Sequence, residues 1–151
     1  MADKPTIHCT VAVPNRQLFD GEVYYASIPG VEGQFGVLPG HELILSLTKE
    51  GGLCTLYLDE AHTEKKEILL FDGIAQVAED KLTVLGRLGK LCERIHGEEM
   101  RERASAQEKL VEELQAMQED DDKHVKAQLE QEKLRLKWYN IQVDWANKYN
   151  K

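Results

Sequence analysis

EGQFGVLPGH, the ten residues from Glu32 to His41, is the stretch from which the organisation of this chain can be worked out. Three glycines and one proline stand among large apolar side chains. Glycine supplies backbone angles that other residues reach only with strain, and proline fixes a bend and lacks an amide donor. The segment is therefore predicted to be a tightly turned connection that directs a few side chains outward. An ordinary turn explains it equally well, so the flanking sequence has to decide.

Up to about residue 90, the flanking sequence has the pattern of β-strands. Residues 7, 9, 11 and 13 are apolar and would share one face of a strand. Ile68–Phe71 is a continuous apolar run, typical of a strand buried on both faces. Turn residues such as Gly51-Gly52, Asp59–Lys65, Asp72-Gly73 and Ala78–Asp80 separate the short runs. Short strands about 8–12 residues apart predict a β-sandwich of short antiparallel strands or a flattened barrel.

Composition narrows the class of protein further. The chain has 151 residues, 42% of them apolar, which suffices for a real core in one domain or two small ones. The net charge of −8 argues against a general nucleic-acid binder, which needs a basic face. The sequence has no apolar run long enough to span a membrane and begins without a secretory signal, so a cytosolic protein is expected. Its three cysteines are widely spaced and are predicted to be reduced and partly buried, not metal ligands.

From about residue 92 the pattern changes to that of two helices. Residues 94–118 contain no proline, and their apolar or small residues cluster on one helical face: Met100, Ala104, Leu110, Val111, Leu114 and Met117. An acidic stretch follows, from which one of Asp120–Asp122 is expected to cap a second helix over residues 123–150. The predicted fold is thus α+β, with a sandwich over residues 1–90 and an antiparallel helical hairpin over residues 91–151.

The second predicted helix has two apolar faces. Leu134, Trp138, Ile141, Trp145 and Tyr149 lie on one face, and Val125, Leu129, Leu136 and Val143 lie nearly opposite. One face can pack on the first helix. The other either is buried within one compact fold or needs a second surface. The end of this helix is basic and the first helix is acidic, which fits pairing within the hairpin or docking on an acidic partner.

Taken together, these features resemble the epsilon subunit of bacterial F-type ATP synthase, the equivalent of the mitochondrial delta subunit. The order of a sandwich and a helical hairpin matches, and so do Leu18–Val23, Glu32–His41, Asp72–Val77 and Leu82–Leu85. The spacing Gly-x-x-Gly-x-x-Pro-Gly-His is the most specific of these signatures. The resemblance covers nearly the whole chain.

The resemblance implies a non-catalytic rotor subunit. Such subunits join gamma in the central stalk and rest on the c-ring, and rotation couples ion flow to ATP synthesis in the alpha–beta head. The implied contact residues for the c-ring and gamma are Glu32, Gln34, Phe35, Gly36 and His41. Gln34 replaces a residue that is often acidic in the family, and Phe35 is either an exposed anchor or a plug for the sandwich edge. The implied location is the cytoplasmic face of the bacterial cell membrane, as a peripheral part of the complex.

The resemblance also implies that the hairpin can extend into the head and block ATP hydrolysis. A helix that buries comparable apolar area in two places has two states separated by little free energy. The residues expected to hold the inhibitory state are Lys133, Arg135, Lys137, Trp138, Ile141 and Trp145.

One departure from the family concerns nucleotide binding. Some members bind ATP through an Ile/Leu-Asp-x-x-Arg-Ala motif at the start of the first helix, where this chain has Ile95, His96, Glu99 and Met100 at the four motif positions. Glu99 would repel a phosphate, so we predict that the isolated chain does not sense ATP through this motif and has no cofactor.

An enzyme is the main competing class. The sequence lacks a phosphate-binding loop, and its five histidines are scattered, so no catalytic residue and no metal ligand is predicted. A third class is a free-standing sandwich adaptor with a coiled-coil arm, which would not bind a gamma subunit.

Overall fold

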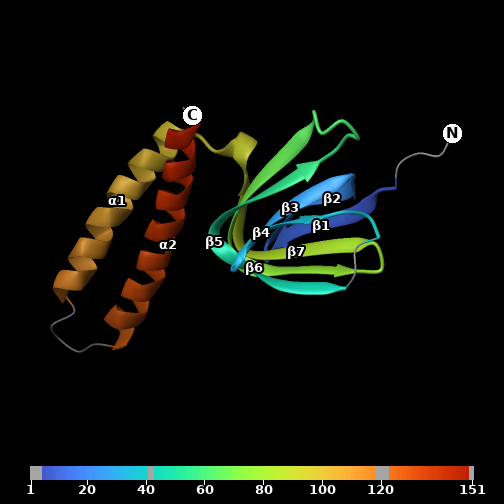
Figure 1. Cartoon of the computed structure of the whole chain (residues 1–151). Helices are drawn as coiled ribbons and strands as arrows, with labels where there is room; N and C mark the ends of the chain where they lie inside the picture. The colour runs from blue at the N-terminus through green and yellow to red at the C-terminus, as the bar shows by residue number, and fades with distance from the viewer. Residues whose placement is uncertain (1–4, 41–42, 118–122, 150–151) are drawn as a thin grey trace. The chain divides into compact units, whose positions relative to one another are not determined.

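The computed structural model describes residues 5–40, 43–117 and 123–149. The chain divides into two compact units, Met1–Arg94 and Ile95–Lys151 (Figure 1). Within the described residues, the first unit holds the strands and a short 3-10 helix, Cys92–Arg94, and the second holds two α-helices. The predicted α+β class is therefore confirmed.

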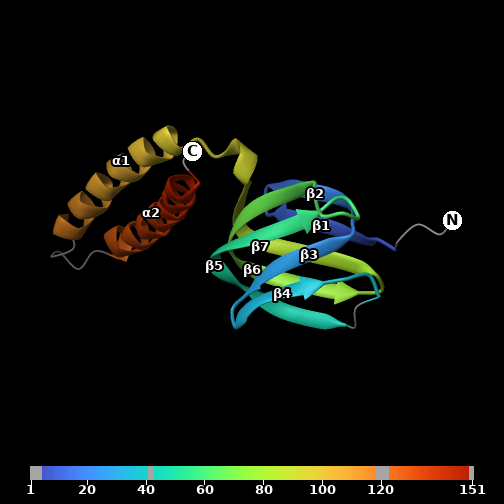
Figure 2. The same cartoon turned by 45° about the horizontal axis from the view of Figure 1, so that its top comes forward.

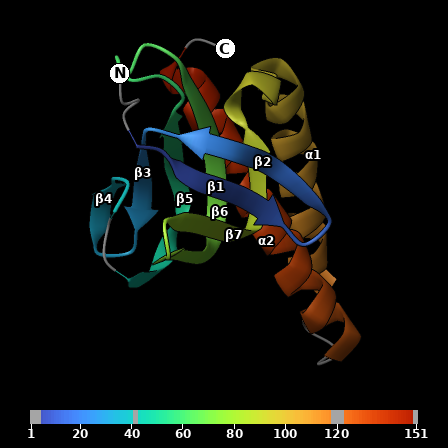
Figure 3. The ribbon, with the colours of Figure 1, turned by 90° about the vertical axis from the view of Figure 1, so that its right-hand side faces the viewer.

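The first unit is a single sheet that folds over on itself. Its strands are β1 (Ile7–Val13), β2 (Arg16–Val23), β3 (Tyr25–Gly30), β4 (Gly33–Val37), β5 (Ile44–Tyr57), β6 (Lys65–Ala78) and β7 (Lys81–Leu91), in the order β2-β1-β7-β6-β5-β3-β4. One core cluster contains Ile7 and Val11 of β1 together with Ile28 of β3 and Val37 of β4. These strands stand near opposite ends of the sheet order, so the sheet must curl to bring them together. Figures 2 and 3 show the resulting layers, with β1 and β2 crossing in front of β5 and β6 in Figure 3.

Two strands are longer than the sequence predicted. Gly51-Gly52 and Asp72-Gly73 were expected to separate short strands, but β5 and β6 run through them. Each site is an irregularity that bends the strand without reversing it: the β5–β6 register shifts between Glu50 and Gly52, and Asp72 and Gly73 have φ of 59° and 154°. Because β6 continues past its bend, its first half pairs with the end of β7 and its second half pairs with the start.

One strand pair departs from the predicted antiparallel arrangement. β1 and β7 are parallel, with His8 opposite Lys81 and Ala12 opposite Leu85. The other pairs are antiparallel. Parallel neighbours need a long connection, and here all of β2 to β6 lies between the two strands in the sequence.

The turn at Ala78–Asp80 and the loop at Asp59–Lys65 lie where the sequence predicted them. Glu79 and Asp80 have φ of 52° and 59°, so two consecutive left-handed residues connect β6 to β7, as in a type I′ hairpin turn. In the longer loop the Asp59 carboxylate accepts hydrogen bonds from the amides of Thr63 and Glu64. The hydrogen bond from the Thr63 hydroxyl is the largest cause that lowers the pKa of Asp59, and the two amide bonds lower it further.

The second unit is the predicted helical pair, α1 (Gly97–Ala116) and α2 (Lys123–Lys148). Val111, Leu114 and Leu129 form a buried apolar cluster, against which Leu110 and Leu136 pack. The prediction for α1 is wrong at Met117, which is 59% exposed. It also missed Gln107, a polar residue that is buried on the same face. The expected aspartate cap of α2, within residues 120–122, lies outside the described residues.

All three cysteines are free and buried. Burial raises the pKa of Cys9 and of Cys92 to about 12 and raises that of Cys54 still further. A thiol with so high a pKa stays protonated at neutral pH, so these residues act as small core side chains, as predicted.

Candidate functional site

The glycine-rich segment begins in a turn and continues as a strand. It was predicted to be a turned connection throughout, but Gly33–Val37 forms β4, which pairs with β3 in the register Ile28 to Phe35. Farther along, the Gly40 amide donates a hydrogen bond of 3.0 Å to the Asp80 carboxylate. The segment is therefore fixed at both ends. His41 lies outside the described residues.

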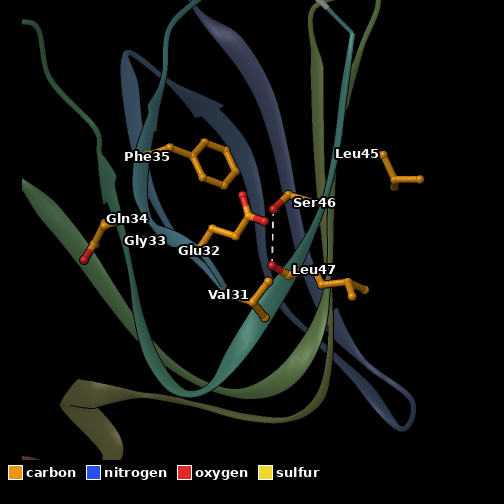
Figure 4. Close-up of a pocket in the computed structure, with 9 residues that line it drawn as sticks. Val31, Glu32, Gly33, Gln34, Phe35, Leu45, Ser46 and Leu47 are labelled. Carbon is orange, nitrogen blue, oxygen red and sulfur yellow. Dashed lines mark hydrogen bonds between the residues drawn. The ribbon is translucent and has the colours of Figure 1, made fainter.

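Beside this segment is an open pocket of about 510 Å³. Its walls are Gly30–Phe35 from the β3–β4 region and Leu45–Leu47 from β5 (Figure 4). In Figure 4 the side chains of Glu32 and Phe35 face the same space as Ser46, and the Ser46 hydroxyl donates to the Leu47 carbonyl at 3.2 Å. The pocket combines an exposed carboxylate with an aromatic ring, which suits a side chain with a cationic end and an apolar stem, whereas the side chains of Leu45 and Leu47 lie on the other side of β5 (Figure 4).

The other predicted contact residues of this segment have partners inside the chain. Gln34 projects from the opposite side of β4 to Phe35 (Figure 4), and its amide donates 2.7 Å to the Ser27 hydroxyl and 3.3 Å to the Leu53 carbonyl. Phe35 is half-buried and packs against the sandwich core, so within this chain it closes the sandwich edge. Gly36 lies against Tyr25, whose hydroxyl is 2.0 Å from the position that a β-carbon on Gly36 would take.

The most conspicuous surface is made of residues that are not among the predicted contact residues. Leu47 pairs with Ile74 across β5 and β6, and Ile74 pairs with Leu85 across β6 and β7. Residues paired directly across a sheet point to the same side, and these three are 58%, 43% and 52% exposed. Leu45, two residues before Leu47, is 72% exposed and lies on the same side of β5 as Leu47 in Figure 4. We call these four residues the outer apolar face.

The outer apolar face could have been predicted from the sequence, because the alternation of residues along β5 puts Leu45 and Leu47 on one side of the strand. Leu45 and Leu47 alternate with Ile44 and Ser46, and a strand in a sandwich normally presents polar residues outward. Apolar residues on both sides of β5 therefore imply a second covered surface. A contiguous exposed apolar patch on a folded chain usually marks a site of association.

The predicted inhibitory residues all lie on α2 but do not form one group. Lys133, Arg135 and Lys137 are exposed, whereas Trp138, Ile141 and Trp145 are partly buried. The Trp145 ring packs on Tyr149 with 5.3 Å between ring centroids, and its indole N–H is buried without an acceptor among the described residues. The side of α2 buried against α1 is instead the one that carries Leu129.

The four positions aligned with the ATP motif lie at the start of α1. His96 is the N-cap residue but makes no capping hydrogen bond through its side chain. Glu99 pairs with Arg103 at 2.6 Å, one turn farther along. Ile95 and Met100 are buried. The Glu99 carboxylate is already paired with Arg103 and would repel a phosphate group. The buried side chains of Ile95 and Met100 offer a phosphate no hydrogen bond.

A charged cluster lies on the β1–β2 hairpin. His8 Nδ1 is 3.1 Å from Glu22 Oε1, and His8 Nε2 is 2.7 Å from Asp20 Oδ1. Hydrogen bonds to Glu22 and then Asp20 raise the pKa of His8 above 6.5. Hydrogen bonds from Thr6 and His8 lower the pKa of Glu22, and those from His8 and Thr10 lower that of Asp20. The doubly protonated ring, which can donate from both nitrogens, is the form that this arrangement favours.

This cluster predicts a pH dependence of stability. A histidine whose pKa is higher in the folded state contributes stability that is complete below its unfolded value of 6.5 and is lost as pH rises through the folded value. The carboxylates of Asp20 and Glu22 contribute stability above their unfolded pKa values, and this stability is lost as pH falls through their lowered folded values. The cluster therefore stabilises the fold most at a pH above the unfolded pKa values of the carboxylates and below that of His8. Urea unfolding at about pH 6 and about pH 8 should give a lower free energy of unfolding at the higher pH.

His8→Gln is the control for this prediction. The glutamine side chain keeps a hydrogen-bonding group but cannot titrate, so the part of the pH dependence due to His8 should disappear. An unchanged difference between the two pH values in the variant would mean that other groups cause it.

The described residues form neither a metal-binding cluster nor a membrane-spanning helix. In the described ranges, no group of three or more His, Cys, Asp or Glu side chains could hold a metal ion. Over the same residues, neither α1 nor α2 has a stretch apolar and long enough to cross a membrane.

Sequence comparison places the sandwich in a known family. Residues 6–87 match the family model described as the beta-sandwich domain of the ATP synthase Delta/Epsilon chain. The ATP synthase epsilon chain of Nitrobacter winogradskyi is 36% identical over 90 residues, which are 60% of this chain and 64% of that one. The epsilon chain of Afipia carboxidovorans is 38% identical over 80 residues, covering 53% of this chain and 56% of the relative. The matches thus span less than two thirds of these relatives' lengths.

A solved structure extends the likeness to the whole fold. A chain in the mitochondrial ATP synthase of Euglena gracilis, solved as OSCP/F1/c-ring, superposes with a TM-score of 0.58 over 97% of this chain and 84% of that one. At 22% identity this likeness concerns the fold alone. Because the family model matches more than half of the chain, the chain belongs to the ATP synthase delta/epsilon family.

Proposed function

We propose that this chain is a rotor subunit in the central stalk of an F-type ATP synthase. It couples ion-driven rotation of the c-ring to ATP synthesis in the alpha–beta head and carries no catalytic residue itself. The observation that supports this most is that the family match over residues 6–87 contains the whole outer apolar face and the glycine-rich segment. A subunit that transmits torque has to be held firmly, and an exposed apolar sheet face provides such a contact.

Each surface is assigned a partner by its chemistry. The outer apolar face, centred on Ile74, binds the gamma subunit through apolar contacts. The pocket lined by Glu32, Phe35 and Ser46 receives the polar loops of the c-ring, where a basic side chain can pair with the Glu32 carboxylate. The subunit then sits on the cytoplasmic face of the bacterial cell membrane and reaches the bilayer only through the complex.

The test of this assignment is direct binding to a purified gamma subunit. Size-exclusion chromatography of the mixture should give a one-to-one complex that elutes ahead of either protein. If the two proteins elute separately at micromolar concentrations, the chain is a free-standing adaptor and the rotor assignment fails.

The hairpin is proposed to inhibit ATP hydrolysis in the assembled complex. Its exposed cations, Lys133, Arg135 and Lys137, can meet acidic groups of the head. Trp138, Ile141 and Trp145 are only partly covered in the chain alone. Each large apolar side chain that becomes fully buried is worth roughly 1.5–3 kcal/mol, so three of them can offset the loss of contacts between α1 and α2.

Deleting residues 123–151 is therefore expected to raise ATP hydrolysis by the assembled complex. The deletion removes the proposed blocking residues, while the described strands of the first unit remain. Hydrolysis is measured on purified complexes whose content of the shortened subunit has been quantified, because loss of the subunit could mimic the effect. Equal hydrolysis by fully occupied wild-type and shortened complexes would reject the inhibitory role.

A further inference from the structure

The contact between α1 and α2 is uneven along its length. Near the connection between the helices it is apolar, because Val111, Leu114 and Leu129 form a buried cluster with Leu110 and Leu136 packed against it. We call this part the loop half. The remainder, residues 97–107 of α1 with residues 139–148 of α2, is called the open half.

Few large apolar side chains of the open half are fully buried. Its buried residues are Gly97, Met100, Ala104 and Gln107 on α1 with Gln142 and Ala146 on α2. Met100 is the one large apolar side chain in this set. Glycine and alanine remove little area from water, and stabilisation by burial is roughly proportional to that area.

Polar groups occupy the rest of this contact. Gln107 Nε2 donates to the Glu132 carbonyl at 2.9 Å and also to the Glu132 carboxylate, which joins the helices at the border between the two halves. Gln142 is 2% exposed, and its amide donates within α2, to the Trp138 carbonyl at 3.4 Å. The carbonyl oxygen of Gln142 is buried without a donor among the described residues. A buried polar atom without a partner destabilises the state in which it is buried.

We propose that α2 separates from α1 in two steps, with the open half detaching while the loop half stays paired. The contact from Gln107 to Glu132 marks the border, because it satisfies the last polar groups before the apolar cluster. Release of the open half breaks the exposed hydrogen bond from Arg101 Nε to Asn147 Oδ1, returns the Gln142 amide to water and uncovers one fully buried large apolar side chain, Met100. Release of the loop half instead exposes five aliphatic side chains. This inference concerns contacts within one chain and does not depend on the rotor assignment.

Residue-resolved hydrogen exchange on the full chain tests the proposal. In the wild type, amides at 141–146 should exchange at least about tenfold faster than those at 129–136. Because helix ends also fray, faster exchange at 141–146 alone does not distinguish the two causes, and the variant Gln142→Leu is needed to separate them. It removes the unpartnered carbonyl and adds apolar contact, and it should slow exchange in the open half by about tenfold and leave the loop half unchanged.

Two further variants complete the design. Gln131→Leu makes the same change at an exposed position of α2 and should alter neither half. Leu129→Ala weakens the apolar cluster and should speed exchange in the loop half alone. If Leu129→Ala speeds both halves equally, or if Gln142→Leu slows both equally, α2 separates as one unit and the proposal is wrong.

Discussion

A chain carrying Leu47→Glu together with Ile74→Lys is expected to lose at least about 100-fold in affinity for the gamma subunit, or about 2.7 kcal/mol. Both side chains belong to the outer apolar face and lie directly opposite each other on β5 and β6. The double change puts two charges where the interface would exclude water, and it removes two aliphatic side chains worth roughly 1.5–3 kcal/mol each when buried.

The isolated sandwich should tolerate this double change. Leu47 and Ile74 are 58% and 43% exposed, and opposite charges facing each other across strands contribute roughly 0.2–1 kcal/mol. Thermal unfolding of the isolated variant should therefore stay close to that of the wild type, while calorimetry with gamma records the loss of affinity.

Two controls separate an interface effect from a general one. Leu47→Val with Ile74→Val keeps the surface apolar and should weaken binding only slightly, by about one methylene group at each position. Ala61→Glu adds a charge in the exposed loop between β5 and β6 and should leave binding unchanged. If the charged pair binds gamma as tightly as the wild type, the outer apolar face is not the gamma contact.

Gly73→Ala is expected to cost at least about 3 kcal/mol of folding free energy. Gly73 has φ of 154°, a conformation that residues with a β-carbon rarely adopt. A β-carbon at this position would lie 2.1 Å from the Leu85 carbonyl oxygen and 2.9 Å from the Gly86 α-carbon. Both neighbours are backbone atoms of β7, so relief requires the two strands to move apart.

Gly40→Ala is the matched control for backbone strain. Gly40 also has a positive φ, 78°, but a β-carbon there would meet nothing within 4 Å. Its cost should be about 1–2 kcal/mol, the strain of a left-handed residue alone. Urea unfolding of both variants measures the difference, and similar midpoints for the two would mean that β6 and β7 adjust without cost at Gly73.

The sequence predicted the fold well where side-chain periodicity and turn chemistry agree. The alternation of residues 7–13 gave β1 its buried Ile7 and Cys9, and the helical spacing placed α1 and α2 within a few residues. It failed at Gly51 and Asp72-Gly73, because the same residues that end a strand in a turn can also bend it in a bulge. Which of the two occurs depends on whether the strand keeps its neighbours, and that is a property of the whole sheet.

The candidate site was harder to predict. Glu32, a predicted contact residue, lines the pocket beside the glycine-rich segment. Whether Phe35 is an anchor or a plug depended on where the core lies, which the sequence alone does not show. The outer apolar face is assembled from β5, β6 and β7, so its residues become neighbours only through strand pairing. Trp138 and Trp145 were correctly placed away from Leu129 on α2, because helical periodicity is local and needs no tertiary information.

The parallel pairing of β1 with β7 also bears on how the chain is made. Ile7 and Val11 enter the core from the first strand, yet their strand is completed on one side by residues 81–85. During synthesis the N-terminal hairpin must therefore wait, with apolar side chains uncovered, until β7 has left the ribosome. Contacts between such distant parts of a sequence slow folding, so the nascent chain is most vulnerable to aggregation before the last strand arrives.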